Sequence, residues 1–174
     1  MNLVLEAIKN RRSIRKFKPD MVQQNTIDQI VEAGLYAASG MNRQTTKIVV
    51  IKNKELRDKL SNEKRKIDGW QDGLDPFYGA PVVLVVLANT EQGTYLEDGS
   101  LVMGNLMLAA HALGVGSCWI HRAKEIFELP EYKDFLHSLG ITGKWVGVGH
   151  CILGYPNEEP IAPPRNPNRV HIVD

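Results

Sequence analysis

The chain has 174 residues, 43% hydrophobic and 24% charged, a composition that suits one compact globular domain and excludes disorder and fibres. Its 21 basic and 20 acidic residues leave a net charge of +1, which argues against a broad nucleic-acid-binding surface and a polybasic membrane anchor. Two cysteines, Cys118 and Cys151, are too few for a disulfide scaffold and lack the spacing of a zinc ribbon. We therefore expect reduced thiols, a cytoplasmic location and a partner that is a small molecule.

The first part of the chain predicts two helices and a strand. A short helix covers residues 3–9 and leads into a basic, extended stretch. A capping box of Thr26 with Gln29 precedes apolar residues at helical spacing, so we expect a helix that stops at Gly40. Residues 47–52 predict a buried strand, because four apolar residues in succession leave no solvated face.

The next elements are a charged helix and a second buried strand. Asn53 is placed to cap the helix, whose apolar residues share one side. The loop of residues 69–79 carries aromatic side chains and suits a lid or pocket rim. Pro81 then opens a buried strand over residues 82–88.

Residues 99–120 contain no Asp, Glu, Lys or Arg and match a bilayer span in length. Internal polar residues and the helix-ending Gly114 instead predict a buried helix, capped by Asp98, then a strand over residues 117–120, with no membrane span. A helix that is apolar on nearly all faces needs cover on nearly all sides. A second subunit would supply it; a central helix in a monomeric core is the alternative.

The last part of the chain predicts one helix, one strand and a tail. Pro130 suits the first turn of a helix that runs to about Leu139, and residues 144–153 predict the fourth strand. Five of the nine prolines follow Gly154, so residues 154–174 should form an extended tail along a surface. We find no internal repeat, and we assign residues 1–174 to a single domain.

The densest charge cluster combines three guanidinium groups and a hydroxyl at Arg11, Arg12, Ser13 and Arg15. Arginine offers a fork of donors that matches phosphate oxygens, and serine adds a short donor. In an extended segment, residues 11, 13 and 15 point the same way. The cluster predicts a phosphate site, and a solvated basic turn is the alternative that composition leaves open.

A loop of residues 40–44, between the expected helix and strand, carries the carboxamides of Asn42 and Gln44. Each carboxamide presents a donor and an acceptor, as a pyrimidine-like ring edge requires. A helix cap followed by a turn is the alternative interpretation.

The remaining sequence motifs argue against a dinucleotide fingerprint, a metal site and a serine hydrolase. The glycines in residues 114–117 and 147–149 do not form a dinucleotide fingerprint, since the first set ends a helix and the second lies in a strand. The first set does suit backbone N–H donors that approach a flat ligand. The histidines lack metal-ligand spacing, no GxSxG elbow is present, and the apolar context of Cys118 indicates a packed thiol and not a nucleophile.

Taken together, these motifs resemble the nitroreductase family of flavin mononucleotide (FMN) enzymes over nearly the whole chain. Four stretches occur in family order and spacing: residues 11–15, 39–44, 108–120 and 152–156. The resemblance implies an α+β, nitroreductase-like fold in which helices flank a central mixed or antiparallel sheet. It also implies an intertwined homodimer that holds two FMN molecules at its interface.

The resemblance assigns cofactor-binding roles to Arg11, Arg12, Ser13, Arg15, Asn42, Gln44, Gly116, Ser117, Cys118 and Arg165. Residues 11, 13 and 15 resemble the phosphate and ribityl ligands, and residue 12 contributes through its neighbourhood or backbone. The two carboxamides resemble flavin-facing groups that the other subunit usually supplies. Residues 116–118 resemble the loop that approaches the isoalloxazine ring, and Arg165 resembles a tail arginine that closes on the phosphate.

Two departures alter the wall near the ring. Thr45 and Thr46 follow the glutamine where many relatives have proline and an aromatic residue, and Ala38 replaces the usual proline before Ser39 and Gly40. These changes bear on substrate preference.

The implied activity is an FMN-dependent oxidoreductase that transfers hydride from NAD(P)H, through flavin N5, to a nitroaromatic, quinone or similar small acceptor by a ping-pong mechanism. Because the flavin carries the chemistry, we expect no catalytic side chain and no metal. One alternative is a flavoprotein that binds FMN without turnover, as a sensor or carrier. Within the family, the alternatives are oxygen-dependent flavin cleavage and reductive dehalogenation.

Overall fold

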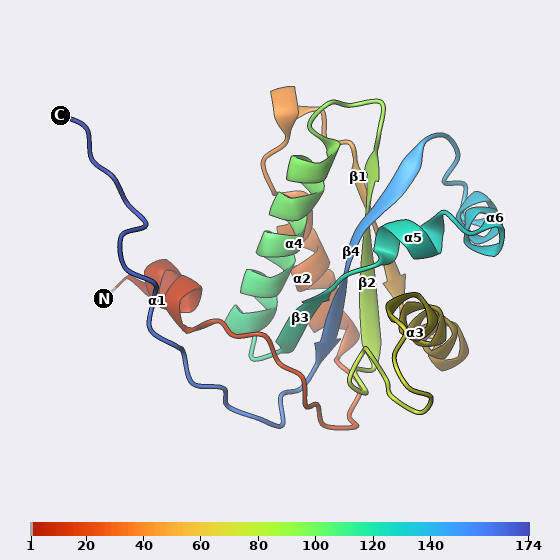
Figure 1. Ribbon diagram of the computed structural model, residues 1–174, viewed down its shortest axis with the longest axis horizontal. Helices are drawn as coiled ribbons and strands as arrows, with labels where there is room; N and C mark the ends of the chain where they lie inside the picture. Colours follow the sequence, from red (N-terminus) through yellow and green to blue (C-terminus); the bar gives the residue numbers. More distant parts are fainter. Residues whose placement is uncertain (1) are drawn as a thin grey trace.

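The computed structural model describes residues 2–174, which form a four-stranded antiparallel sheet in the order β1-β2-β4-β3, flanked by helices (Figure 1). The strands are β1 Thr46–Ile51, β2 Val82–Asn89, β3 Gly116–Ile120 and β4 Trp145–Gly154. The helices are α1 Leu3–Asn10, α2 Gln24–Leu35, the 3-10 turn η1 Gly40–Asn42, α3 Lys54–Asp68, α4 Tyr95–Ala112, α5 Ala123–Phe127 and α6 Pro130–Ser138. The predicted α+β fold is confirmed, and the sheet is antiparallel throughout.

Two apolar cores cover the two faces of the sheet. In β2, alternate residues point to opposite faces, so Leu84 packs toward α2 and α4 while Val83 and Val85 pack toward α3, α5 and α6. Residues 82–88 are completely buried, as their unbroken apolar run predicts. Figure 1 shows the resulting three layers, with α2 and α4 on one side of the sheet.

Several predicted boundaries are correct because their signals are local. The side chain of Asn53 caps α3 by accepting the amide hydrogen of Leu56 at 2.8 Å. Pro130 occupies the first turn of α6, as expected. The short helix α5 had no recognised sequence signal.

Other predictions about individual elements are wrong. Helix α2 begins at Gln24, which places Thr26 inside the helix and removes the capping box, and it ends at Leu35. The strand β1 lies at a sheet edge, so its Val50 remains 38% exposed. Of the aromatic residues in the loop of residues 69–79, Phe77 is fully buried in the core, whereas Trp70 is 40% exposed.

Helix α4 packs centrally within its layer but is not covered on every side. Asn105 donates a hydrogen bond to the carbonyl of Ala33 in α2 at 3.0 Å. Leu96 and Leu101 remain 53% and 50% exposed. Among residues 2–174, none of the helices has the length and apolar character that a membrane crossing requires.

The N-terminal connection, residues 11–18, lies between the start of β3 and the chain that leaves β4. The amide of Ile14 donates to the carbonyl of Ser117, and the amide of Lys18 donates to the carbonyl of Tyr155, both at 2.9 Å. Beyond this point the tail is extended and runs past α1 (Figure 1).

Candidate cofactor site

The basic segment, residues 11–16, is hydrogen-bonded to the start of β3 through the amide of Ile14 and the carbonyl of Ser117. Ser13 forms a bridge with Ser117, and Ile14 is buried. A Cβ atom on Gly116 would lie only 3.0 Å from the Cβ of Ile14, so glycine permits this close approach. Because an extended chain alternates its side chains, the burial of Ile14 directs Ser13 and Arg15 to the opposite side of the segment.

The guanidinium groups of Arg11 and Arg12 have different surroundings. Arg12 donates through Nη1 to the carbonyls of Lys9, at 2.7 Å, and Arg11, at 2.6 Å. The Nη1 atom of Arg11 and the Nε atom of Arg12 are both buried and have no hydrogen-bond partner among residues 2–174. Burial and the two neighbouring guanidinium groups lower the pKa of His111 on α4. A buried, unpaired cationic donor is costly unless a ligand anion satisfies it, so this region fits a phosphate group.

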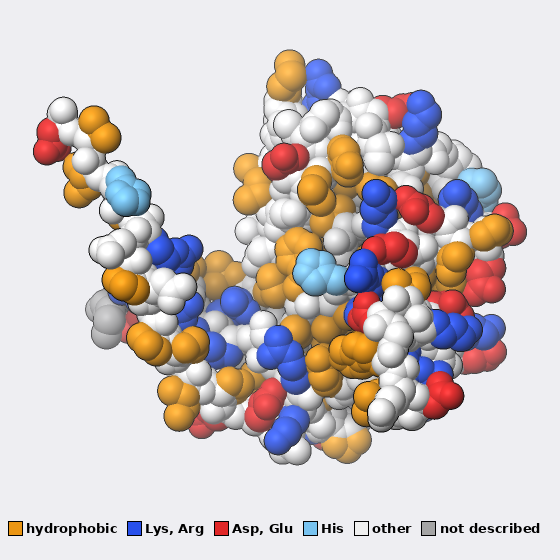
Figure 2. All heavy atoms as spheres, in the orientation of Figure 1, with side chains coloured by type: hydrophobic (Ala, Val, Ile, Leu, Met, Phe, Trp, Pro, Cys, Tyr) orange, Lys and Arg blue, Asp and Glu red, His pale blue; other side chains and the backbone are white. Residues whose placement is uncertain are grey.

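A groove of about 630 Å³ lies beside the basic segment. It is lined by Asn10, Arg12, Ile14, His111, residues 114–116, Pro156, residues 158–160 and Ala162. Figure 2 shows a wide hollow between the main body and the outlying α1 and tail, with basic and hydrophobic side chains along it. The groove is therefore open on the side that the tail faces.

The predicted strand over residues 117–120 is confirmed as β3, which also contains Gly116, so residues 116–118 lie in a strand and not in the loop that the resemblance implies. They pair with residues 152–154 of β4, which keeps them extended. Ser117 is 2% exposed, and Cys118 is buried in the core shared with α5 and α6. The structure therefore brings Gly116 and Ser117 next to Ser13, while the thiol of Cys118 packs into the apolar interior.

The carboxamide loop lies at the other end of α4. Asn42 and Gln44 are exposed, and the side-chain amide of Gln44 donates to Oδ1 of Asn42 at 3.1 Å. Both residues have a positive φ, 54° and 52°, which is uncommon outside glycine. The conformation is held in part by Ser39, whose hydroxyl accepts the amide hydrogen of Gln44 at 3.0 Å.

Asp98 was predicted to cap α4, and that prediction is wrong because the helix begins at Tyr95. The buried carboxylate instead accepts the amide hydrogen of Gly40 at 2.9 Å. Asp98 therefore joins the body of α4 to the carboxamide loop.

A single chain does not bring all the predicted site residues together. The 18 residues of α4 span about 27 Å, and they separate the carboxamide loop from the basic segment near Gly114 (Figure 1). Arg165 lies in the exposed tail, beyond the last tail residue that is bonded to the basic segment. Within one chain the predicted site residues therefore form separate groups.

A second groove, which the sequence did not reveal, lies at the far end of β3. It measures about 560 Å³ and is lined by Lys64, Asp68, His121, Arg122, Lys124, Glu125 and Val148. Arg122 has a φ of 76° and donates to Asp68 at 2.9 Å and Glu125 at 2.7 Å. The charged residues of this groove come from separate elements, so no local motif marks it.

Comparisons with known proteins agree with this geometry. Residues 8–155 match the model of the nitroreductase family. An FMN-bound nitroreductase from Bacteroides fragilis shares 28% identity and a TM-score of 0.86, with all of both chains covered. An FMN-bound nitroreductase from Desulfitobacterium hafniense shares 30% identity, with the same TM-score and coverage. An NAD(P)H-dependent FMN reductase from Bacillus subtilis is 26% identical over 96% of this chain and 71% of its own length.

The antiparallel sheet, its flanking helices and the matched residues define a flavoprotein-type α+β fold, and the chain belongs to the nitroreductase family. The resemblance inferred from the sequence motifs is thereby confirmed.

Proposed function

We propose that this protein is an FMN-dependent oxidoreductase that takes electrons from NAD(P)H and reduces a nitroaromatic, quinone or similar small acceptor by a ping-pong mechanism. The FMN-bound relatives and the Bacillus subtilis reductase support the cofactor and the donor. The observation that carries the proposal is the buried, unpaired Nη1 of Arg11 in a segment fastened to β3. Such a donor calls for an anion, and the FMN phosphate supplies one.

The basic segment would hold the phosphate and the ribityl chain through Arg11, Ser13 and Arg15. Arg12 already donates to two carbonyls of its own turn. These two bonds support the indirect role inferred for Arg12, while its buried Nε, like Nη1 of Arg11, has no partner among residues 2–174. The backbone of Gly116 and Ser117, beside Ser13, would line the edge along which the cofactor lies, with Cys118 contributing main chain only.

Asn42 and Gln44 would reach the cofactor from a second copy of the chain, because α4 keeps them far from the basic segment of their own copy. The exposed Leu96 and Leu101 support such a homodimer. An apolar groove of about 400 Å³ between α1, α2 and α4 supports it as well. In the same assembly the tail would bring Arg165 to a phosphate.

When bound, FMN supplies the hydride chemistry by accepting electrons from the nicotinamide and passing them to the acceptor. The protein side chains then have to bind the cofactor, orient the two substrates and exclude water from the site. None of them has to act as an acid or a base. The carboxamides of Asn42 and Gln44 offer donors and acceptors suited to a polar ring edge.

Anaerobic addition of NADH or NADPH to the FMN-loaded protein tests this proposal. We expect loss of the yellow flavin absorbance within the time of mixing, and its return when a quinone or nitroaromatic is added. Double-reciprocal plots at several acceptor concentrations should be parallel. A flavin that stays oxidised with both nucleotides would contradict the proposal and favour a sensor or carrier.

A further inference from the structure

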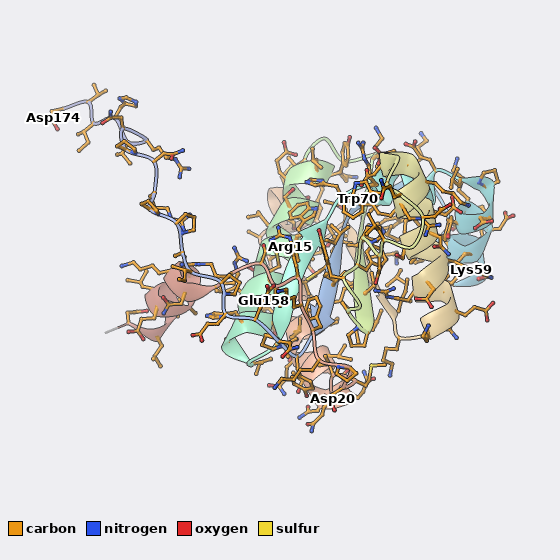
Figure 3. The ribbon with its side chains drawn as sticks, turned by 60° about the horizontal axis from the view of Figure 1, so that its bottom comes forward. Arg15, Asp20, Lys59, Trp70, Glu158 and Asp174 are labelled. Carbon is orange, nitrogen blue, oxygen red and sulfur yellow. The ribbon has the colours of Figure 1, made fainter. Side chains whose placement is uncertain are left out.

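A carboxylate from the tail is bonded to the backbone of the basic segment. Oε1 of Glu158 accepts the amide hydrogens of both Arg15 and Lys16, the latter at 3.1 Å. Figure 3 shows Arg15 and Glu158 close together, although 143 positions separate them in the chain. Two successive amides that converge on one oxygen fix the backbone at the residue that carries the Arg15 guanidinium.

The two tail residues immediately before Glu158 are also paired with the basic segment or the residue that follows it. The amide of Asn157 donates to the carbonyl of Lys16 at 2.9 Å, and Phe17 forms a bridge with Pro156. Beyond Glu158, residues 159–174 make no backbone hydrogen bond to the rest of the described chain. Glu158 is thus the last fixed point before the tail departs toward Arg165.

We propose that Glu158 is a positioning residue for the cofactor phosphate, an inference that rests on the proposed function. By holding the amides of Arg15 and Lys16, its carboxylate sets the direction in which the Arg15 side chain leaves the segment. The same contact anchors the tail. One side chain, that of Glu158, therefore determines both the orientation of Arg15 and the place where the tail that carries Arg165 begins.

The charge of Glu158 and its hydrogen bonds have opposite effects on phosphate binding. A carboxylate near a phosphate repels it, so the charge alone weakens FMN binding. The bonds to the two amides order the segment before the cofactor arrives, which strengthens binding. In an alternative arrangement, the Glu158 carboxylate occupies the position that the phosphate would take. Removal of the carboxylate would then strengthen FMN binding, as removal of its charge would.

Two conservative variants separate these effects. Glu158→Gln removes the charge and retains an oxygen that can accept both amide hydrogens. Glu158→Asp retains the charge but is shorter by one methylene and cannot reach both amides from the same backbone. Glu159→Gln serves as the matched control, because Glu159 is adjacent, exposed and lines the same groove.

The measurement is the Kd of FMN and of riboflavin for the purified wild-type protein and the three variants, by flavin fluorescence. We expect Glu158→Asp to raise the Kd of FMN about tenfold, as for the loss of one charge-assisted hydrogen bond, and to change that of riboflavin much less. Glu158→Gln and Glu159→Gln should leave the Kd of FMN unchanged or lower it. Urea unfolding of each variant controls for folding.

The inference is overturned if Glu158→Asp binds FMN as tightly as the wild type, or if Glu158→Gln weakens FMN as much as Glu158→Asp does. Equal weakening of FMN and riboflavin would overturn it too, since the effect would not concern the phosphate. A wild-type protein that takes up no FMN would contradict the proposed function itself.

Discussion

The carboxylate of Asp98 holds the amide of Gly40 at 2.9 Å across 58 positions of sequence. Asp98 is 3% exposed, and its second oxygen accepts the hydroxyl hydrogen of Thr94 at 3.2 Å. A Cβ on Gly40 would meet Thr94 Oγ1 at 2.3 Å, so the loop lies tightly against the start of α4. Gly40 is therefore held in place, and the residues with positive φ that follow it, including Asn42, are anchored at this end.

Asp98→Ala should destabilise the protein and loosen the carboxamide loop. The change leaves the amide of Gly40 without its partner, which costs about 1–3 kcal/mol of unfolding free energy. Urea unfolding measures this loss, and the Kd of FMN should rise as well. Asp98→Asn keeps an acceptor oxygen and should be affected less in both measurements. Equal loss in the two variants would mean that the charge, and not the bond to Gly40, is what matters.

Arg15→Ala should raise the Kd of FMN about tenfold to a hundredfold, because a charge-assisted bond to the phosphate is lost. Riboflavin, which lacks the phosphate, should be affected far less. Lys16→Ala is the matched control, as Lys16 is adjacent and also exposed. If Arg15→Ala weakens riboflavin and FMN equally, Arg15 does not bind the phosphate.

Asp75 should make the unfolding free energy of the protein depend on pH in the acidic range. Burial alone would raise the pKa of this carboxyl, but hydrogen bonds from Arg57, from Ser61 and from the amides of Phe77 and Gly79 hold the pKa below its ordinary value. Because the pKa of Asp75 is lower in the folded protein, the carboxylate contributes its full stabilisation at pH values above the ordinary pKa of 3.8. That stabilisation is lost as the pH falls through the lowered pKa of the folded state. Unfolding free energies of the wild type and Asp75→Asn should therefore differ near neutral pH and converge in strong acid. A constant difference would contradict this assignment.

Cys118→Ala should leave most of the turnover rate intact. The thiol is 2% exposed and packs in the core with α5 and α6, so its loss leaves a small cavity. We expect a decrease of about 1 kcal/mol in unfolding free energy. Steady-state assays of the FMN-loaded variant check the rate. A loss of several orders of magnitude with FMN still bound would place the thiol in the chemistry.

The parts of the fold that the sequence predicted depend on local signals. Asn53 caps α3 and Pro130 begins α6 because each needs only the next few residues. Thr26 and Gln29 have the spacing of a capping box, but α2 begins two residues earlier, at Gln24. Sequence patterns also do not show that β1 lies at an edge, since strand order depends on pairing partners far along the chain.

The site was predictable only in its pieces. The sequence predicts candidate roles for Arg11, Ser13, Asn42 and Gln44 because the chemistry of a side chain can be read without the fold. The contacts that organise them, Asp98 with Gly40 and Glu158 with Arg15, join residues 58 and 143 positions apart. No local pattern reports such pairs.

The central claim is that one flavin site combines the basic segment of one copy with the carboxamide loop of another. Two variants with different affinity tags test it when they are produced together: Arg15→Ala, and Asn42→Ala combined with Gln44→Ala. A mixed dimer purified through both tags would carry one intact site and one site with all the substitutions. We predict that it retains about half the FMN of the wild-type dimer, more than either variant alone. A mixed dimer that retains no more FMN than its parents, or the absence of any dimer, would contradict the claim.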